Sequence, residues 1–165
     1  MFPKLAKVSE EQYRPDISVQ GKGYITICVA RNSRATNVYW QLVDPDFSLL
    51  ELGFEWPSGR LINCAVSLFN GEVEDCQNQT PPQGNPGTPM FDLSPWPLQV
   101  SEREVRGSHI KQPGRIRLLK KHKGVSIVCQ EGFPLRSVEY GGKLVCDFGG
   151  GNELLALSLV GDFPL

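Results

Sequence analysis

Apolar and polar residues alternate along most of this chain, a period of two that is typical of strands with one buried face. In residues 49–56, for example, Leu50, Leu52 and Phe54 alternate with polar or small residues. The pattern predicts strands at 24–30, 38–43, 49–56, 61–69, 115–120, 125–130, 135–140, 143–148 and 153–160. Gly, Pro, Asn and Asp cluster between these segments, as turns require.

Short strands without helical patterns between them predict an all-β fold. We expect an antiparallel two-sheet sandwich or open barrel of about 9–11 short strands, with little helix, in which residues 1–165 form a single β domain. Residues 4–13 favour one short helix.

Residues 78–98 differ from the rest because they hold six of the thirteen prolines. Proline excludes a central strand there. The segment either links two halves, 14–77 and 99–165, or forms a functional loop across one end of the sandwich. Since Phe91, Leu93 and Trp96 are too apolar for a flexible linker, we expect its later part to pack onto the body.

The net charge of -1 conceals two opposite blocks. Residues 44–92 contain eight acids and one base, whereas residues 102–123 contain eight bases and two acids. Either the two blocks lie side by side and compensate each other, or they steer charged partners to the surface. The predicted partner-binding acidic patch is Asp44, Asp46, Glu72, Glu74 and Asp75, and the alternative basic patch is Arg115, Arg117, Lys120, Lys121 and Lys123.

The residue combinations that most enzymes need are missing from the sequence. His109 and His122 belong to no metal-binding motif, no GxSxG motif occurs, and the glycine runs form no phosphate-binding fingerprint. We therefore expect no catalytic residues, no metal and no cofactor. The remaining catalytic route is an acid pair, Glu72 with Glu74 or Asp44 with Asp46, but acids in turns and at strand ends are usually solvated.

Five cysteines without a CxxC pair indicate a reducing compartment, and the first residues lack the apolar core of a signal peptide, so we expect a cytoplasmic protein. Four of them lie in apolar strand-like segments and are expected to be buried, namely Cys28, Cys64, Cys129 and Cys146. Cys76 follows acidic residues and is expected to be the most exposed. No apolar segment is long enough to cross a membrane as a helix.

Two segments resemble small bacterial all-β proteins of the toxin-immunity type. Residues 47–62, FSLLELGFEWPSGRLI, are similar to a recurrent sequence pattern in those proteins. The pattern consists of two leucines, an acid, an aliphatic residue, Gly-Phe-acid, a glycine turn, a base and an aliphatic residue. Residues 151–159, GNELLALSL, resemble their closing strand. The resemblance covers about a third of the chain and implies a non-enzymatic protein that blocks a cognate toxin. It identifies no functional residues.

Taken together, these features favour a non-catalytic β-sandwich that binds another protein, such as an immunity or inhibitor protein whose acidic patch meets a basic toxin or nuclease domain. The alternative is a carbohydrate-binding β-sandwich in which Tyr39, Trp40, Trp56 and Trp96 stack on sugars. An acid-pair hydrolase is the less favoured third hypothesis. Nucleic acid is a poor candidate partner because the chain is near neutral and the basic segment has no interleaved aromatic residues.

Overall fold

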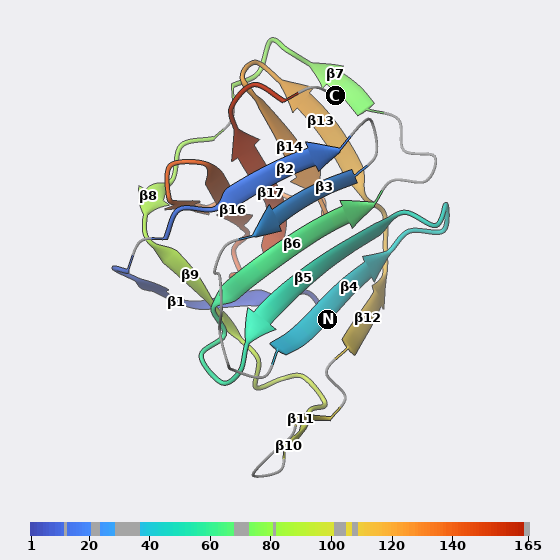
Figure 1. The fold of residues 1–165 in the computed structure, drawn as a ribbon, viewed down its shortest axis with the longest axis vertical. Helices are drawn as coiled ribbons and strands as arrows, with labels where there is room; N and C mark the ends of the chain where they lie inside the picture. Colours follow the sequence, from blue (N-terminus) through green and yellow to red (C-terminus); the bar gives the residue numbers. More distant parts are fainter. Residues whose placement is uncertain are drawn as a thin grey trace.

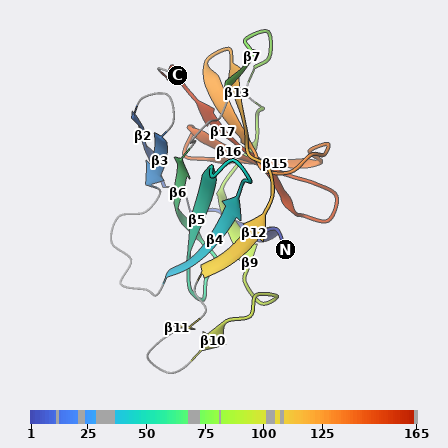
Figure 2. The same cartoon turned by 90° about the vertical axis from the view of Figure 1, so that its right-hand side faces the viewer.

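The protein is an all-β structure in which two large sheets lie face to face (Figures 1 and 2). The computed structural model describes residues 1–11, 13–20, 24–28, 37–67, 73–80, 82–100, 105–106 and 109–163. Within these residues all the regular structure is strand, which confirms the predicted fold class. The nine predicted strands all form in their described parts, most limits differ by one or two residues from those expected, and residues 29–30 and 68–69 lie outside the described residues.

The first sheet has six strands, and its order is β12 (His109–Pro113), β4 (Asn37–Val43), β5 (Leu49–Glu55), β6 (Leu61–Ser67), β3 (Tyr24–Cys28) and β2 (Asp16–Gln20). It faces the viewer in Figure 1. Along β4 the side chains of Val38, Trp40 and Leu42 are completely buried, whereas the residues between them are partly exposed. This is the alternation that the sequence pattern predicts for a sheet with one face in the core.

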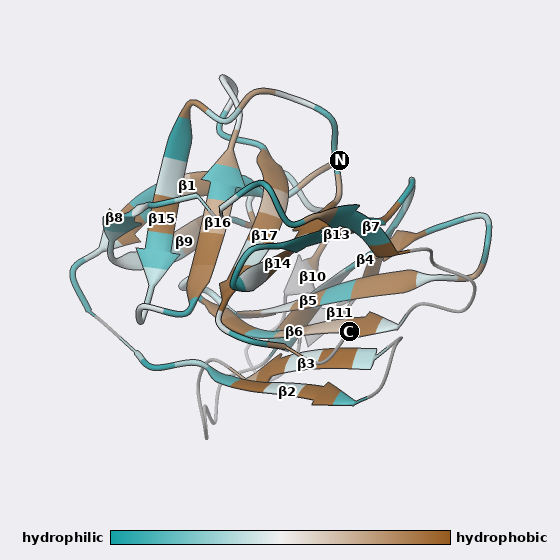
Figure 3. Ribbon diagram, turned by 90° about the horizontal axis from the view of Figure 1, so that it is seen from above, coloured by the Kyte–Doolittle hydropathy of each residue, from teal (hydrophilic) through white to brown (hydrophobic). Residues whose placement is uncertain are grey.

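The second sheet has seven strands, and its order is β7 (Val73–Cys76), β13 (Arg117–Lys121), β14 (Gly124–Val128), β17 (Leu154–Val160), β16 (Leu144–Phe148), β15 (Arg136–Tyr140) and β8 (Asn85–Pro86). Its apolar face packs against the first sheet, and Figure 3 shows hydrophobic positions on the strands of both sheets. One continuous core joins them, with Trp40 and Phe54 from the first sheet and Tyr140 and Phe148 from the second.

Most strand pairs are antiparallel, as expected, but three edge pairs are parallel: β12 with β4, β7 with β13, and β8 with β15. Each parallel pair brings together segments that are far apart in the sequence. β12 follows the proline-rich segment yet joins the sheet of residues 16–67, while β7 and β8 join the sheet of residues 117–160. The chain before the proline-rich segment thus contributes the edge strand β7 to the seven-stranded sheet, and the chain after it contributes the edge strand β12 to the six-stranded sheet.

Two small sheets complete the fold. β1 (Lys4–Ser9) pairs with β9 (Thr88–Asp92), and β10 (Gln99–Val100) pairs with β11 (Val105–Arg106) in the projection at the bottom of Figure 1. The helix predicted over residues 4–13 is wrong, because the backbone of β1 is paired with β9 instead.

The later part of the proline-rich segment packs onto the body, as expected. Phe91, Leu93 and Trp96 are all at least 95% buried. The ring of Phe91 lies 4.8 Å from that of Phe54 and 5.8 Å from that of Phe148, measured between centroids. Since Phe54 and Phe148 belong to different large sheets, Phe91 fills the space between the layers.

Candidate functional site

The acidic and basic segments meet along one edge of the seven-stranded sheet. Strand β7 lies parallel to β13, with Glu74 opposite Leu119 and Asp75 opposite Lys120. Arg117 donates two hydrogen bonds to Glu74, from Nε to Oε1 at 2.7 Å and from Nη2 to Oε2 at 2.8 Å. Its Nη1 donates to Glu131 at 2.6 Å. Through its hydrogen bonds the Arg117 guanidinium lowers the pKa of Glu74 below the usual value. Glu74 and Arg117 are thus each other's counter-ions.

Asp44 has a structural role in the turn between β4 and β5. Its side chain is buried, and both carboxylate oxygens accept backbone hydrogen bonds. Oδ1 accepts from the N–H of Asp46 and Oδ2 from the N–H of Ile116, each at 2.9 Å. Because Ile116 lies between β12 and β13, this carboxylate ties the turn to the point where the chain crosses from one large sheet to the other.

The predicted acidic patch is therefore only partly available to a partner. Asp46 and Asp75 are exposed, but Asp46 is in a turn of the six-stranded sheet and Asp75 is on β7 of the other sheet. Glu72 lies outside the described residues. Of the two proposed acid pairs, the first depends on Glu72, and in the second the Asp44 carboxylate is already occupied by backbone N–H groups.

The aromatic residues proposed for sugar stacking are mostly part of the core. Trp40 is fully buried and its Nε1 donates a hydrogen bond to the carbonyl oxygen of Met1 at 3.1 Å, and Trp96 is 5% exposed. Trp56 is half-buried against the core, and the Tyr39 ring stacks on His109 with 5.2 Å between centroids. Trp40 and Trp96 have no open ring face to offer a sugar.

The cysteine predictions are confirmed for three of the four residues that we expected to be buried. Cys64, Cys129 and Cys146 are buried, and burial raises the pKa of each thiol, to about 12 for Cys129. Cys28 is exposed, contrary to expectation, because β3 directs Ile25 and Ile27 to the core and the residue after them outward. Cys76 is half-buried and therefore less exposed than Cys28, so the prediction that Cys76 is the most exposed cysteine is also wrong.

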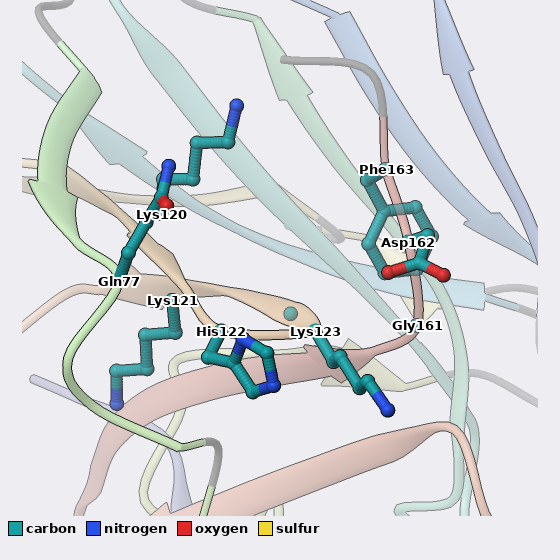
Figure 4. A pocket seen from close by; sticks show the side chains of 9 residues that line it. Gln77, Lys120, Lys121, His122, Lys123, Gly161, Asp162 and Phe163 are labelled. Carbon is teal, nitrogen blue, oxygen red and sulfur yellow. The ribbon is translucent and has the colours of Figure 1, made fainter.

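Three of the five predicted basic residues are brought together at the end of β13. Lys120, Lys121 and Lys123 line a cleft of about 200 Å³, together with His122 and Gln77. The opposite side of the cleft is formed by Gly161, Asp162 and Phe163 from the C-terminal segment (Figure 4). We call residues 120–123 the lysine turn. Of the other two basic residues, Arg117 is paired with acids, and exposed Arg115 lines a separate cleft of about 450 Å³ beside Phe2.

Strand and turn geometry place these four consecutive polar residues along the cleft with their side chains pointing in different directions. Lys120 and Lys121 are neighbours on β13, so their side chains point to opposite sides of the strand, as Figure 4 shows. Lys121 pairs with Gly124, which leaves His122 and Lys123 to form the tight turn into β14. Lys123 has φ 55°, in the left-handed region that non-glycine residues rarely adopt.

Backbone hydrogen bonds hold the lysine turn on two sides. The N–H of His122 donates to the carbonyl oxygen of Gln79 at 2.9 Å, and the N–H of Gly161 donates to that of Lys123 at 2.9 Å. The first bond fixes the turn to the chain after β7, and the second fixes it to the segment after β17. The cleft is thus built from three parts of the chain that are distant in sequence.

Sequence reasoning identified the lysines from their charge but missed Gln77, His122, Asp162 and Phe163 as neighbours. His122 stands between two lysines, and this was the one available signal. Nothing in the sequence relates residues 77 and 162 to the turn, because their proximity depends on the strand order β7-β13-β14-β17.

Comparison with known proteins adds no relative: no protein-family model matches the chain, and no curated protein is significantly similar to it in sequence. In the described part of the chain, no group of three or more His, Cys, Asp and Glu side chains is placed to hold a metal ion. No helix in that part is long and apolar enough to span a membrane.

Proposed function

We propose that this chain is a non-catalytic β-sandwich that binds another protein, and that the lysine turn is the centre of its binding surface. The observation that supports this proposal is the unequal use of the two charge blocks. The Asp44 carboxylate is engaged by backbone N–H groups and Glu74 by Arg117, whereas the lysine turn borders an open cleft. The favoured partner accordingly presents acidic groups.

Electrostatic complementarity would act mainly on the rate and selectivity of binding. Opposite charge on a partner steers encounter, and like charge disfavours wrong partners. Such attraction weakens as ionic strength rises, since the screening length is about 8 Å at physiological salt. The more specific role of neutralising a bacterial toxin rests on the resemblance of residues 47–62 and 151–159, and it stays part of the proposal on that ground.

The test compares capture of partners from lysates of cells that naturally produce the chain. The bait proteins are the wild type, the triple variant K120Q/K121Q/K123Q, and the control K4Q/K7Q/K111Q, which removes the same charge from exposed sites on β1 and β12. Equal thermal unfolding midpoints for the two variants establish that both are folded. Each capture is repeated after nuclease treatment and at raised salt.

We expect a protein that is captured by the wild type and the control but lost with the triple variant and at high salt. Capture that is unchanged in the triple variant would place the interface elsewhere and overturn the role of the lysine turn. Capture that disappears after nuclease treatment would identify nucleic acid as the ligand and overturn the protein-binding proposal.

A further inference from the structure

Strand β2 forms one outer edge of the six-stranded sheet. It pairs with β3 along its whole length, in an antiparallel register without a bulge. Figures 2 and 3 show it as the last strand of that sheet. No backbone hydrogen bond joins residues 17–20 to any described residue outside β3. The side of β2 that faces away from β3 therefore presents N–H and C=O groups with which another strand can pair.

The other three edges of the two large sheets have features that keep further strands away. Natural edge strands use short length, charge and proline for this purpose. β8 has only 2 residues, one of which is proline, and β7 contains Glu74 and Asp75. β12 contains Lys111 and ends in Pro113. Residues 17–20 of β2 contain neither a charge nor a proline, so β2 is the edge best suited to pairing.

The apolar side of β2 is incompletely covered. Ile17 and Val19 pack against the core but remain partly exposed. Their partners on β3, Ile27 and Ile25, are each 1% exposed. A strand beyond β2 with apolar residues in register would cover Ile17 and Val19 as β2 covers β3. The strand that fits this edge therefore has apolar residues at alternate positions.

The sequence of β2 itself meets this requirement, because its pattern is symmetric about Ser18. When two copies run antiparallel with their Ser18 residues opposed, each Ile17 lies opposite Val19 of the second copy. Asp16 then lies opposite Gln20, so no like charges face each other. Opposed residues are an even number of positions apart in the sequence, so their outward backbone groups meet. A second copy of β2 thus matches this edge in apolar pattern, charge and backbone.

We propose that β2 is a dimerisation edge, where a second copy of this chain adds its own β2 in antiparallel orientation about a two-fold axis beside Ser18. The pairing joins the six-stranded sheets of the two copies into one continuous sheet. Since five residues span only about 17 Å of strand, the contact is small, and the dimer is reversible and favoured by concentration. The lysine turn belongs to the other large sheet, so this inference goes beyond the proposed function and does not depend on it.

Sedimentation velocity over a concentration series, from the low micromolar to the millimolar range, measures the dimer. We expect the wild type to dimerise reversibly. S18K and S18E each place two like charges opposite each other at the axis, and each should weaken dimerisation by about tenfold or more. An equimolar mixture of the two variants should dimerise again, because opposite charges then face each other.

Two controls separate the edge from general effects of charge and folding. Ser18 is exposed, so both variants should unfold at the same temperature as the wild type, measured where all are monomeric. S67K adds the same charge at an exposed position of β6, an inner strand of the same sheet, and should dimerise as the wild type does. In addition, hydrogen exchange of the outward-facing amides among residues 17–20 should slow as the concentration of the wild type rises.

Several results would overturn the proposal. A wild type that stays monomeric at millimolar concentration would exclude the dimer, and dimerisation unchanged in S18K and S18E would place the contact elsewhere. A mixture of the two variants that stays monomeric would exclude pairing about Ser18. Capture of another protein by a monomeric wild type, lost in S18K but kept in S67K, would identify a strand of a partner as the occupant.

The failure of this inference is distinguishable from failure of the proposed function. The variant K120Q/K121Q/K123Q should dimerise as the wild type does, because its changes lie on the other sheet. If that variant loses a captured protein while the wild type never dimerises, only the dimerisation edge is wrong. If the wild type dimerises through β2 but capture does not depend on the lysines, only the proposed role of the lysine turn is wrong.

Discussion

Replacing Asp44 by alanine tests whether this acid serves the fold instead of a partner. Asp44 is 8% exposed, and its carboxylate accepts hydrogen bonds from the N–H groups of Asp46 and Ile116, both at 2.9 Å. A hydrogen bond to a charged group contributes about 1.5–3 kcal/mol. Because Asp46 is exposed, its N–H regains a bond to water in the variant, whereas the partly buried N–H of Ile116 loses most of its bond. We therefore expect Asp44→Ala to lower the free energy of unfolding by about 2–4 kcal/mol.

Urea unfolding measures this change, with the fluorescence of buried Trp40 and Trp96 as the signal. Asp44→Asn keeps a side-chain oxygen that accepts one of the two bonds, so its effect should be smaller, about 1–2 kcal/mol. The matched control is Asp46→Ala, two residues away and exposed, which should change stability by no more than about 0.5 kcal/mol.

Two results would refute the reasoning about Asp44. The first is an Asp44→Ala variant whose stability is within about 0.5 kcal/mol of the wild type, because the carboxylate then does not hold the crossover at Ile116. The second is equal destabilisation by Asp46→Ala, because the turn, not the buried carboxylate, would then be responsible. Either result would mean that the Asp44 carboxylate is available to bind a partner.

Three further predictions concern titration and thiol access. Glu74→Gln should be less stable than the wild type at neutral pH, and this difference should vanish as pH falls through the lowered pKa of Glu74, because the protonated carboxyl no longer pairs with Arg117. Equal urea unfolding midpoints at neutral pH would contradict this prediction. Burial raises the pKa of Asp147, so the folded state binds its proton more tightly than the unfolded state and stability falls as pH rises between the two pKa values. Asp147→Asn should abolish that fall, and parallel stability profiles for variant and wild type would disprove it. A maleimide should label native Cys28 first and leave Cys64, Cys129 and Cys146 unlabelled until urea is added, as mass spectrometry of the modified peptides would show.

The central strands were predictable because each has one face in the core. Leu50, Leu52 and Phe54 alternate with more polar neighbours, and all three prove fully buried. The edge strands were not predictable, because an edge strand keeps less of its surface in the core. β12, with the sequence HIKQP, has no buried residue, and its pairing with β4 depends on partners far away in the chain. β1 was mistaken for a helix because Leu5 is the one buried residue in KLAKVS.

The candidate site was predictable in its charges but not in its geometry. A run of bases at 115–123 identified the lysines, yet the same run includes Arg117, whose charge is paired with Glu74 and Glu131. Sequence alone does not show which base pairs with which acid, because the ion pair between residues 74 and 117 requires the parallel pairing of β7 with β13. Asp162 and Phe163 reach the cleft because β17 pairs with β14 up to Val160 and the N–H of Gly161 then donates to the carbonyl oxygen of Lys123.

The register of β7 against β13 decides where the positive charge remains. Glu74 lies opposite Leu119 in the middle of β13, its side chain neutralises Arg117, and β7 ends at Cys76, opposite Lys121. The described acidic strand therefore stops before His122 and Lys123, and the basic segment continues beyond it into the lysine turn. A slip of one residue in this pairing would move the acids to the other face of the sheet and expose the Arg117 charge instead. The pairing of β7 with β13 thus compensates Arg117, and the proposed binding of an acidic partner would depend on the basic residues beyond the end of β7.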